Sequence, residues 1–162
     1  MKLIRPSFEI WEQPSGVDGI YKQIEKVGRV CYRSEDKITE DSAKGFVDRM
    51  IKSGHGAMLE HGTVYLRIPH EYDDSTLTFY EDSEGDYWSN KYSKAIKVWK
   101  DEDTAYTYVT TNLRVLVENG WMDDLKYICE PTKYHAKRIT VRFVCDRGVS
   151  HEFVRHKLLC AA

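Results

Sequence analysis

The sequence predicts an α+β fold, a mixed sheet with flanking helices, because two kinds of hydrophobic periodicity occur in one chain. Segments 63–68 and 139–144 alternate between apolar and polar residues, which is typical of half-buried strands. Segments 20–31 and 39–54 place apolar residues three or four positions apart, as on one face of an amphipathic helix. The chain has 162 residues, a length that suits a single domain. We therefore expect one domain, 1–162.

The first third of the chain predicts a strand followed by two helices. Residues 7–12 alternate and predict a strand, which the Pro-Ser-Gly sequence after it ends. In the first helix, Cys31 shares the apolar face with three aliphatic residues, so its simplest interpretation is a core position. The second helix is expected to begin at Thr39, a good N-cap, and to end at Gly54. The side chains that it should bury are Phe46, Val47, Met50 and Ile51.

The remaining elements are predicted from shorter signals. A hairpin is expected around residues 83–86, and a third helix from 103 to 119, closed by Gly120. Residues 123–129 predict a short helix. After the strand at 139–144, a last helix is expected to begin at Ser150, whose hydroxyl suits an N-cap.

Composition narrows the class of protein. No apolar run approaches the roughly 20 residues that span a bilayer, and the first residues lack the apolar stretch of a secretory signal. The four cysteines form no C-x-x-C pair, which favours free thiols in a reducing compartment over disulfides or a zinc site. We therefore expect a cytoplasmic protein without a bound metal.

Charge is distributed unevenly along the chain, although the net charge is only −2. Seven acids and no base lie between Glu71 and Tyr87, and their simplest interpretation is solvated surface. Seven bases lie in the stretch 133–157, which suggests an anionic ligand such as nucleotide phosphate or nucleic acid. These bases are Lys133, Lys137, Arg138, Arg142, Arg147, Arg155 and Lys157.

The densest group of reactive side chains is the segment 150–157, Ser-His-Glu-Phe-Val-Arg-His-Lys. On a helix His151 and Arg155 share one face, and Glu152 and His156 share the adjacent one. Such an electropositive patch suits a diphosphate or a phosphomonoester. The alternative is an amphipathic helix whose polar face meets only water. The zinc motif H-E-x-x-H is excluded, because Arg155 stands where its second histidine belongs.

A second group, the segment 54–61, reads Gly-His-Gly-Ala-Met-Leu-Glu-His. Its two glycines permit a tight turn whose backbone amides can approach a ligand closely. Glu60 and His61 could form an orienting pair, but a structural role in the core is the favoured interpretation of His61.

Three segments together resemble flavin-dependent thymidylate synthase, which methylates dUMP to dTMP with FAD, NADPH and methylenetetrahydrofolate. The segment 29–32, Arg-Val-Cys-Tyr, resembles part of the family's first helix. The segment 54–61 resembles its Gly-His-x-(Ser/Thr)-Pro-Phe-Glu-His turn, and 147–157 resembles the helix that opens its Arg-His-Arg signature. Each segment is weak alone, but their order matches the family.

The resemblance implies positions for the ligands, and it assigns no catalytic side chain. His55 and Ala57 would lie near the flavin, and Glu152 with Arg155 would reach dUMP. Arg155, His156 and Lys157 would contact FAD. The family is a homotetramer with sites between subunits, so the resemblance also implies a homo-oligomer.

The departures from the family affect what we expect of this chain. Lys157 replaces an arginine, and a lysine cannot reproduce a bidentate contact. The resemblance implies that strands 63–68 and 139–144 pair directly in one sheet, with 71–136 as an insertion between them. It also implies that the family's later ligands lie beyond residue 162, so we expect impaired activity. The alternatives are a non-catalytic flavin- or nucleotide-binding remnant, a partner of a full-length homologue, or a nucleic-acid-binding module. The pI of 6.3 and the few aromatic residues in 133–157 disfavour the last.

Overall fold

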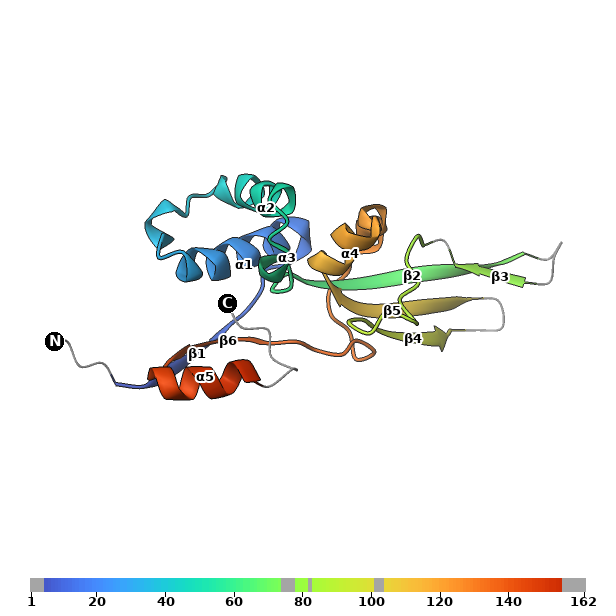
Figure 1. The fold of residues 1–162 in the computed structure, drawn as a ribbon. Helices are drawn as coiled ribbons and strands as arrows, with labels where there is room; N and C mark the ends of the chain where they lie inside the picture. Colours follow the sequence, from blue (N-terminus) through green and yellow to red (C-terminus); the bar gives the residue numbers. More distant parts are fainter. Residues whose placement is uncertain (1–4, 74–77, 82, 101–103, 156–162) are drawn as a thin grey trace.

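A computed structural model describes residues 5–73, 78–81, 83–100 and 104–155, and it has an α+β fold (Figure 1). A four-stranded antiparallel sheet has the strand order β3-β2-β5-β4, and a separate two-stranded ribbon pairs β1 with β6. Helices cover one face of the larger sheet (Figure 1). The predicted α+β class is therefore confirmed, whereas the predicted mixed sheet is not, because every strand pair among the described residues is antiparallel.

The elements have the following bounds. The strands are β1 Ser7–Trp11, β2 Thr63–Asp73, β3 Thr78–Glu81, β4 Lys94–Trp99, β5 Ala105–Asn112 and β6 Thr140–Val144. The helices are α1 Gly16–Cys31, α2 Ser42–Lys52, α3 Gly56–Leu59, α4 Leu113–Asn119 and α5 Arg147–Arg155, with 3-10 turns η1 Glu35–Lys37 and η2 Met122–Tyr127.

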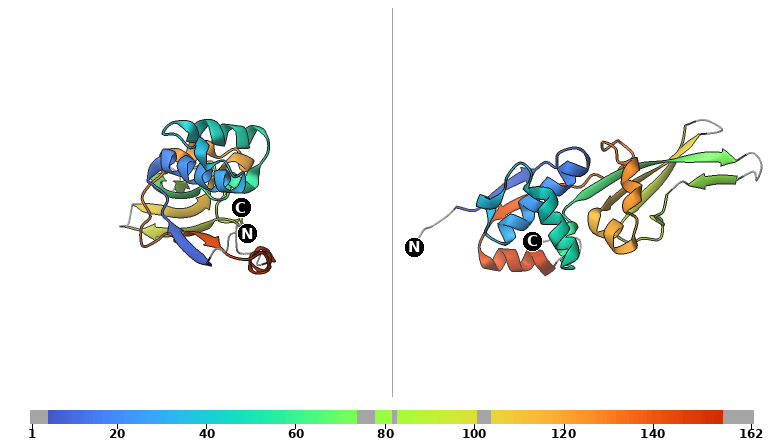
Figure 2. Two further views of the ribbon diagram at one scale, coloured as in Figure 1. Left: turned by 90° about the vertical axis from the view of Figure 1, so that its left-hand side faces the viewer. Right: turned by 90° about the horizontal axis from the view of Figure 1, so that it is seen from above.

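The hydrophobic core lies between the larger sheet and helices α1, α2 and α4. On β2, the alternating residues Val64, Leu66 and Ile68 are fully buried, which confirms the predicted alternation. The helices contribute Ile20, Ile24, Phe46, Val47, Leu113 and Leu116 to the same cluster. Figure 2 shows that the far ends of β2, β3 and β4 extend beyond α1 and α2.

The prediction that the strands at 63–68 and 139–144 share one sheet is wrong. Along β2, residues 63–70 pair with β5, whereas β6 pairs with β1 from Ser7↔Val144 to Trp11↔Thr140. The segment 71–136 supplies β3, β4, β5 and α4, and its Val109 is fully buried in the core. This segment is therefore part of the main sheet and does not project as an insertion.

The third helix, predicted over 103–119, is shorter than predicted, because residues 105–112 form strand β5. This segment, Ala-Tyr-Thr-Tyr-Val-Thr-Thr-Asn, is rich in aromatic and β-branched residues, which favour strands. Helix α4 begins only at Leu113, where the Asn112 side chain accepts a hydrogen bond from the Val115 amide. Its end is as predicted, since Gly120 adopts a left-handed conformation with φ of 78°.

The hairpin predicted at 83–86 is also wrong, because β3 and β4, the strands before and after it, lie at opposite edges of the sheet. The buried carboxylate of Asp124, in η2, instead fixes this crossing segment. It accepts hydrogen bonds from the amides of Glu84 and Gly85 and from the Tyr87 hydroxyl. The short helix predicted at 123–129 is confirmed as the 3-10 turn η2.

Two helices begin at other residues than predicted, and one predicted core residue is exposed. Helix α2 begins at Ser42, three residues after Thr39. Helix α5 begins at Arg147, before Ser150, because the Asp146 carboxylate accepts hydrogen bonds from the first free amides of the helix. Cys31 is exposed, since α1 ends there and its last turn reaches past the core.

Candidate functional site

The first two resembling segments meet in space at Tyr32 and His55. The Tyr32 hydroxyl lies 3.0 Å from His55 Nδ1, and both side chains are exposed. Tyr32 directly follows α1, and His55 directly precedes α3. Gly54 makes this approach possible with a φ of +72°, a conformation that costs other residues free energy.

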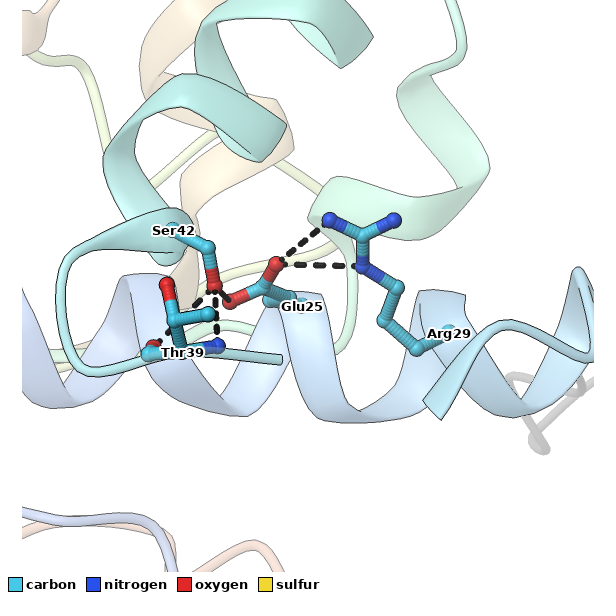
Figure 3. A network of polar contacts seen from close by, with 4 residues as sticks. All are labelled: Glu25, Arg29, Thr39 and Ser42. Atoms are coloured by element: carbon cyan, nitrogen blue, oxygen red, sulfur yellow. Dashed lines mark hydrogen bonds and ion pairs between the residues drawn. The ribbon is translucent and has the colours of Figure 1, made fainter. Parts of the chain in front are cut away.

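A buried ion pair between Arg29 and Glu25 lies on α1, the helix that Tyr32 follows (Figure 3). Arg29 donates to Glu25 Oε1 from Nε at 3.1 Å and from Nη2 at 2.9 Å. The Ser42 hydroxyl lies 2.8 Å from Glu25 Oε2 and accepts a hydrogen bond from the Thr39 amide. The Glu25 side chain is 2% exposed. The network therefore joins α1 to the start of α2 through a carboxylate that is almost completely buried.

Arg114, which the sequence did not single out, lies against the other side of the turn. Its guanidinium forms ion pairs with Glu60, in the turn, and with Glu118 at 2.6 Å. Hydrogen bonds to Glu118 and Glu60 raise the pKa of Arg114 further, so the group stays charged. A Cβ on Gly56 would lie 2.9 Å from Arg114 Nε, so a larger residue there would require the Arg114 side chain to move.

His61, the last residue of the second segment, is largely buried. Its Nε2 has no hydrogen-bond partner among the described residues, and burial lowers its pKa. The side chain is therefore neutral at pH 7 and faces the interior, as the structural interpretation predicted. Glu60 bonds to Arg114, and no hydrogen bond between Glu60 and His61 occurs in the described part of the chain.

Residues 147–155 of the third resembling segment form α5, which packs on the β1-β6 ribbon (Figure 1). The Phe153 ring stacks on Phe143 of β6 with 5.0 Å between centroids, so Phe153 holds α5 against the ribbon. Arg147 Nε lies 3.4 Å from His151 Nε2 on the exposed face. Glu152 is exposed.

Of the remaining predicted cofactor ligands, Ala57 lies in the described part of the chain. Helix α5 includes the backbone of Arg155, but the Arg155 side chain lies outside the described residues, as do His156 and Lys157. Ala57 is exposed on the first turn of α3, beside His55. The structure thus joins the first and second segments, whereas the predicted convergence of His55 and Arg155 stays a prediction.

Much of the basic stretch 133–157 is engaged within the molecule. Arg138 donates from Nη1 to the carbonyl of Thr111 at 3.0 Å and from Nη2 to that of Tyr92 at 2.7 Å. Arg142 lies 3.7 Å from the Glu9 carboxylate across the ribbon. The ion pair with Glu9 offsets part of the Arg142 charge, whereas the hydrogen bonds of Arg138 go to neutral carbonyls and leave its charge in place.

Comparison with protein-family models, with curated proteins and with solved structures finds no match for this chain. The resemblance to flavin-dependent thymidylate synthase therefore rests on the three segments alone. Within the described ranges, no helix is long and apolar enough to cross a membrane. The same residues contain no group of three or more His, Cys, Asp or Glu side chains that could hold a metal ion.

Proposed function

We propose that this chain is a flavin-binding protein of the flavin-dependent thymidylate synthase type, which takes part in the reductive methylation of dUMP. The observation that carries the proposal is the hydrogen bond between Tyr32 and His55. It joins two segments that are 23 residues apart and that resemble the family independently.

The residues around His55 fit a flavin ring in their chemistry. The Tyr32 hydroxyl occupies Nδ1, so the Nε2 edge of the His55 imidazole is available to a ligand. The exposed methyl group of Ala57 and the absence of a side chain at Gly54 leave the turn open to a flat molecule. FAD would supply the hydride chemistry, and the protein would bind and orient it.

The proposed phosphate contacts come from the end of α5 and the two residues after it in the sequence. By resemblance, Arg155, His156 and Lys157 bind the FAD diphosphate, and Glu152 with Arg155 reaches dUMP. The hollow beside β1 and the hollow beside β2 do not include His55. Because the resemblance implies sites between subunits, we propose that a second copy of the chain completes the site, in a homo-oligomer.

Flavin titration of the 162-residue chain tests the proposal. Fluorescence of FAD should quench on binding, and the bound flavin should absorb near 450 nm. His55→Ala and Tyr32→Phe should each weaken binding, whereas Tyr92→Phe should leave it unchanged, because Tyr92 is an exposed tyrosine elsewhere. Equal FAD affinity in all four proteins would refute a flavin site at His55.

Complementation of a thymidine-requiring strain separates an enzyme from a non-catalytic binder. Growth without thymidine that is lost on Arg155→Ala would establish activity. Flavin binding without such growth would identify a non-catalytic flavoprotein. Size-exclusion chromatography with light scattering gives the oligomeric state in the same preparation, and a monomer that binds flavin fully would contradict a site shared between subunits.

A further inference from the structure

A hollow of about 250 Å³ lies beside β2, between the sheet and the segment that follows η2. Its lining residues include Arg67, Pro69, Tyr106, Lys126, Tyr127 and Cys129. Arg67 alternates with the buried residues Leu66 and Ile68, so it stands on the sheet face opposite the helical core. The hollow is therefore separate from the turn at His55.

Two cations and two aromatic rings line this hollow together. The Arg67 guanidinium lies 5.3 Å from the centre of the Tyr106 ring, and Lys126 Nζ lies 4.9 Å from that of Tyr127. The structure shows no carboxylate within ion-pair distance of Arg67 among the described residues. A guanidinium held against a tyrosine ring keeps its charge and its donor fork available to an anion.

The remaining wall of the hollow is neutral. Burial raises the pKa of the Cys129 thiol; the neighbouring Arg67 lowers it and Glu130 raises it by smaller amounts, so the group stays protonated at pH 7. The Cys129 thiol therefore adds no negative charge to the wall, and it offers a polarizable surface to an apolar ring. Pro69 adds a further apolar surface on the β2 side.

We propose that this hollow binds a small anion that carries one aromatic ring. The anionic group, a phosphate or a carboxylate, lies between Arg67 and Lys126, and the ring contacts the tyrosines and Cys129. The volume supports this choice, because sites for drug-sized ligands usually measure about 300–1,000 Å³, and this hollow is smaller. Two tyrosines would be of little use to a bare inorganic ion, which has no apolar surface to cover.

Four probes test the chemistry by calorimetry and by amide chemical shifts of the full chain. Phenyl phosphate and benzoate carry both features and differ in the anionic group, so their ranking identifies which group is preferred. Inorganic phosphate lacks the ring, and benzyl alcohol lacks the charge. We expect saturable binding of phenyl phosphate or benzoate, with shifts at Arg67, Lys126 and Cys129, and at least tenfold weaker binding of the other two probes.

Variants locate the site. Arg67→Gln and Lys126→Gln should each weaken the aromatic anion by about tenfold or more, as loss of a charged hydrogen bond does. Lys94→Gln, which removes an exposed lysine of β4 outside the hollow, should not change affinity. Thermal melts establish that each variant folds, and Arg67→Lys should retain part of the affinity. Unchanged binding in Arg67→Gln, or equal affinity for inorganic phosphate and phenyl phosphate, would overturn the proposal. A flavin does not take part, so failure of the flavin site leaves this result unaffected.

Discussion

Substitution of Glu25 by glutamine should destabilise the protein strongly. Its carboxylate has two contacts from Arg29 and one from Ser42, at 2.8–3.1 Å, and its side chain is 2% exposed. The Glu25→Gln variant keeps the shape but removes the charge, and an amide nitrogen must then face a donor. Arg29 is left as a nearly buried cation without its partner.

The magnitude follows from the burial of both partners. Removing one partner of a buried ion pair lowers the free energy of unfolding by about 3–5 kcal/mol. Arg29 is 11% exposed and lies over the Phe46 ring at 4.9 Å, so some compensation is available and we expect about 3 kcal/mol, the lower end of that range. Domains of this kind have a free energy of unfolding of about 5–15 kcal/mol. The variant should therefore lose a large share of its stability.

Urea unfolding followed by circular dichroism measures this loss. Ser42→Ala removes one hydrogen bond to a charged group and should cost about 1.5–3 kcal/mol. The double variant should cost less than the sum, because both single changes disrupt one network. Asp18→Asn is the control, since Asp18 forms an exposed pair with Lys22 on the same helix and should leave the urea midpoint unchanged. A loss below about 1 kcal/mol in Glu25→Gln would refute the argument that the buried pair holds α1 to α2.

Three further predictions follow from buried groups. Burial lowers the pKa values of His61 and His135 from 6.5. As the pH falls, these histidines therefore bind protons in the unfolded chain before they do so in the folded protein, and the free energy of unfolding should decrease below about pH 6.5. Equal urea midpoints at pH 7.5 and 5.5 would contradict this. Asp124→Ala should cost about 3 kcal/mol, because three donors lose one buried acceptor, and a urea midpoint near that of the unsubstituted protein would show that water replaces the carboxylate. Cys31 is exposed, whereas burial raises the pKa of Cys129, so iodoacetamide should modify Cys31 much faster, as peptide mass spectrometry would show.

The sequence by itself determined the elements whose signals are local. The alternation of Val64, Leu66 and Ile68 predicted a half-buried strand, because side chains of a strand point to opposite faces. Gly120 predicted the end of α4, since glycine accepts a left-handed conformation without steric cost. The three resembling segments were likewise visible, but their roles as ligand sites were only implied.

Only the tertiary structure decided which strands pair. Strands from 63 and 139 carry equally clear alternation, and this pattern says which face is buried but not which partner lies beside each backbone. The selection of β5 as the partner of β2 depends on packing over the whole face, where Thr107 and Val109 are fully buried. The helix predicted over 103–119 failed for a different, local reason: the helical spacing of four apolar residues was given more weight than the β-branched residues between them, which favour a strand.

The candidate site depended on both levels. Sequence proximity predicted the turn at His55, but the contact with Tyr32 joins the end of α1 to the residue before α3, which are distant in the sequence. Arg114 had no signal, because an arginine on an amphipathic helix is ordinary until Glu60 is brought beside it. Likewise, no sequence pattern distinguished Glu25, since only the packing of α2 over α1 removes its carboxylate from water. Hydrophobic periodicity depends on residues that are close in the sequence, whereas hydrogen-bond partners are residues that are close in space. A charged side chain can be buried only where such partners surround it, so the sequence pattern alone does not reveal it.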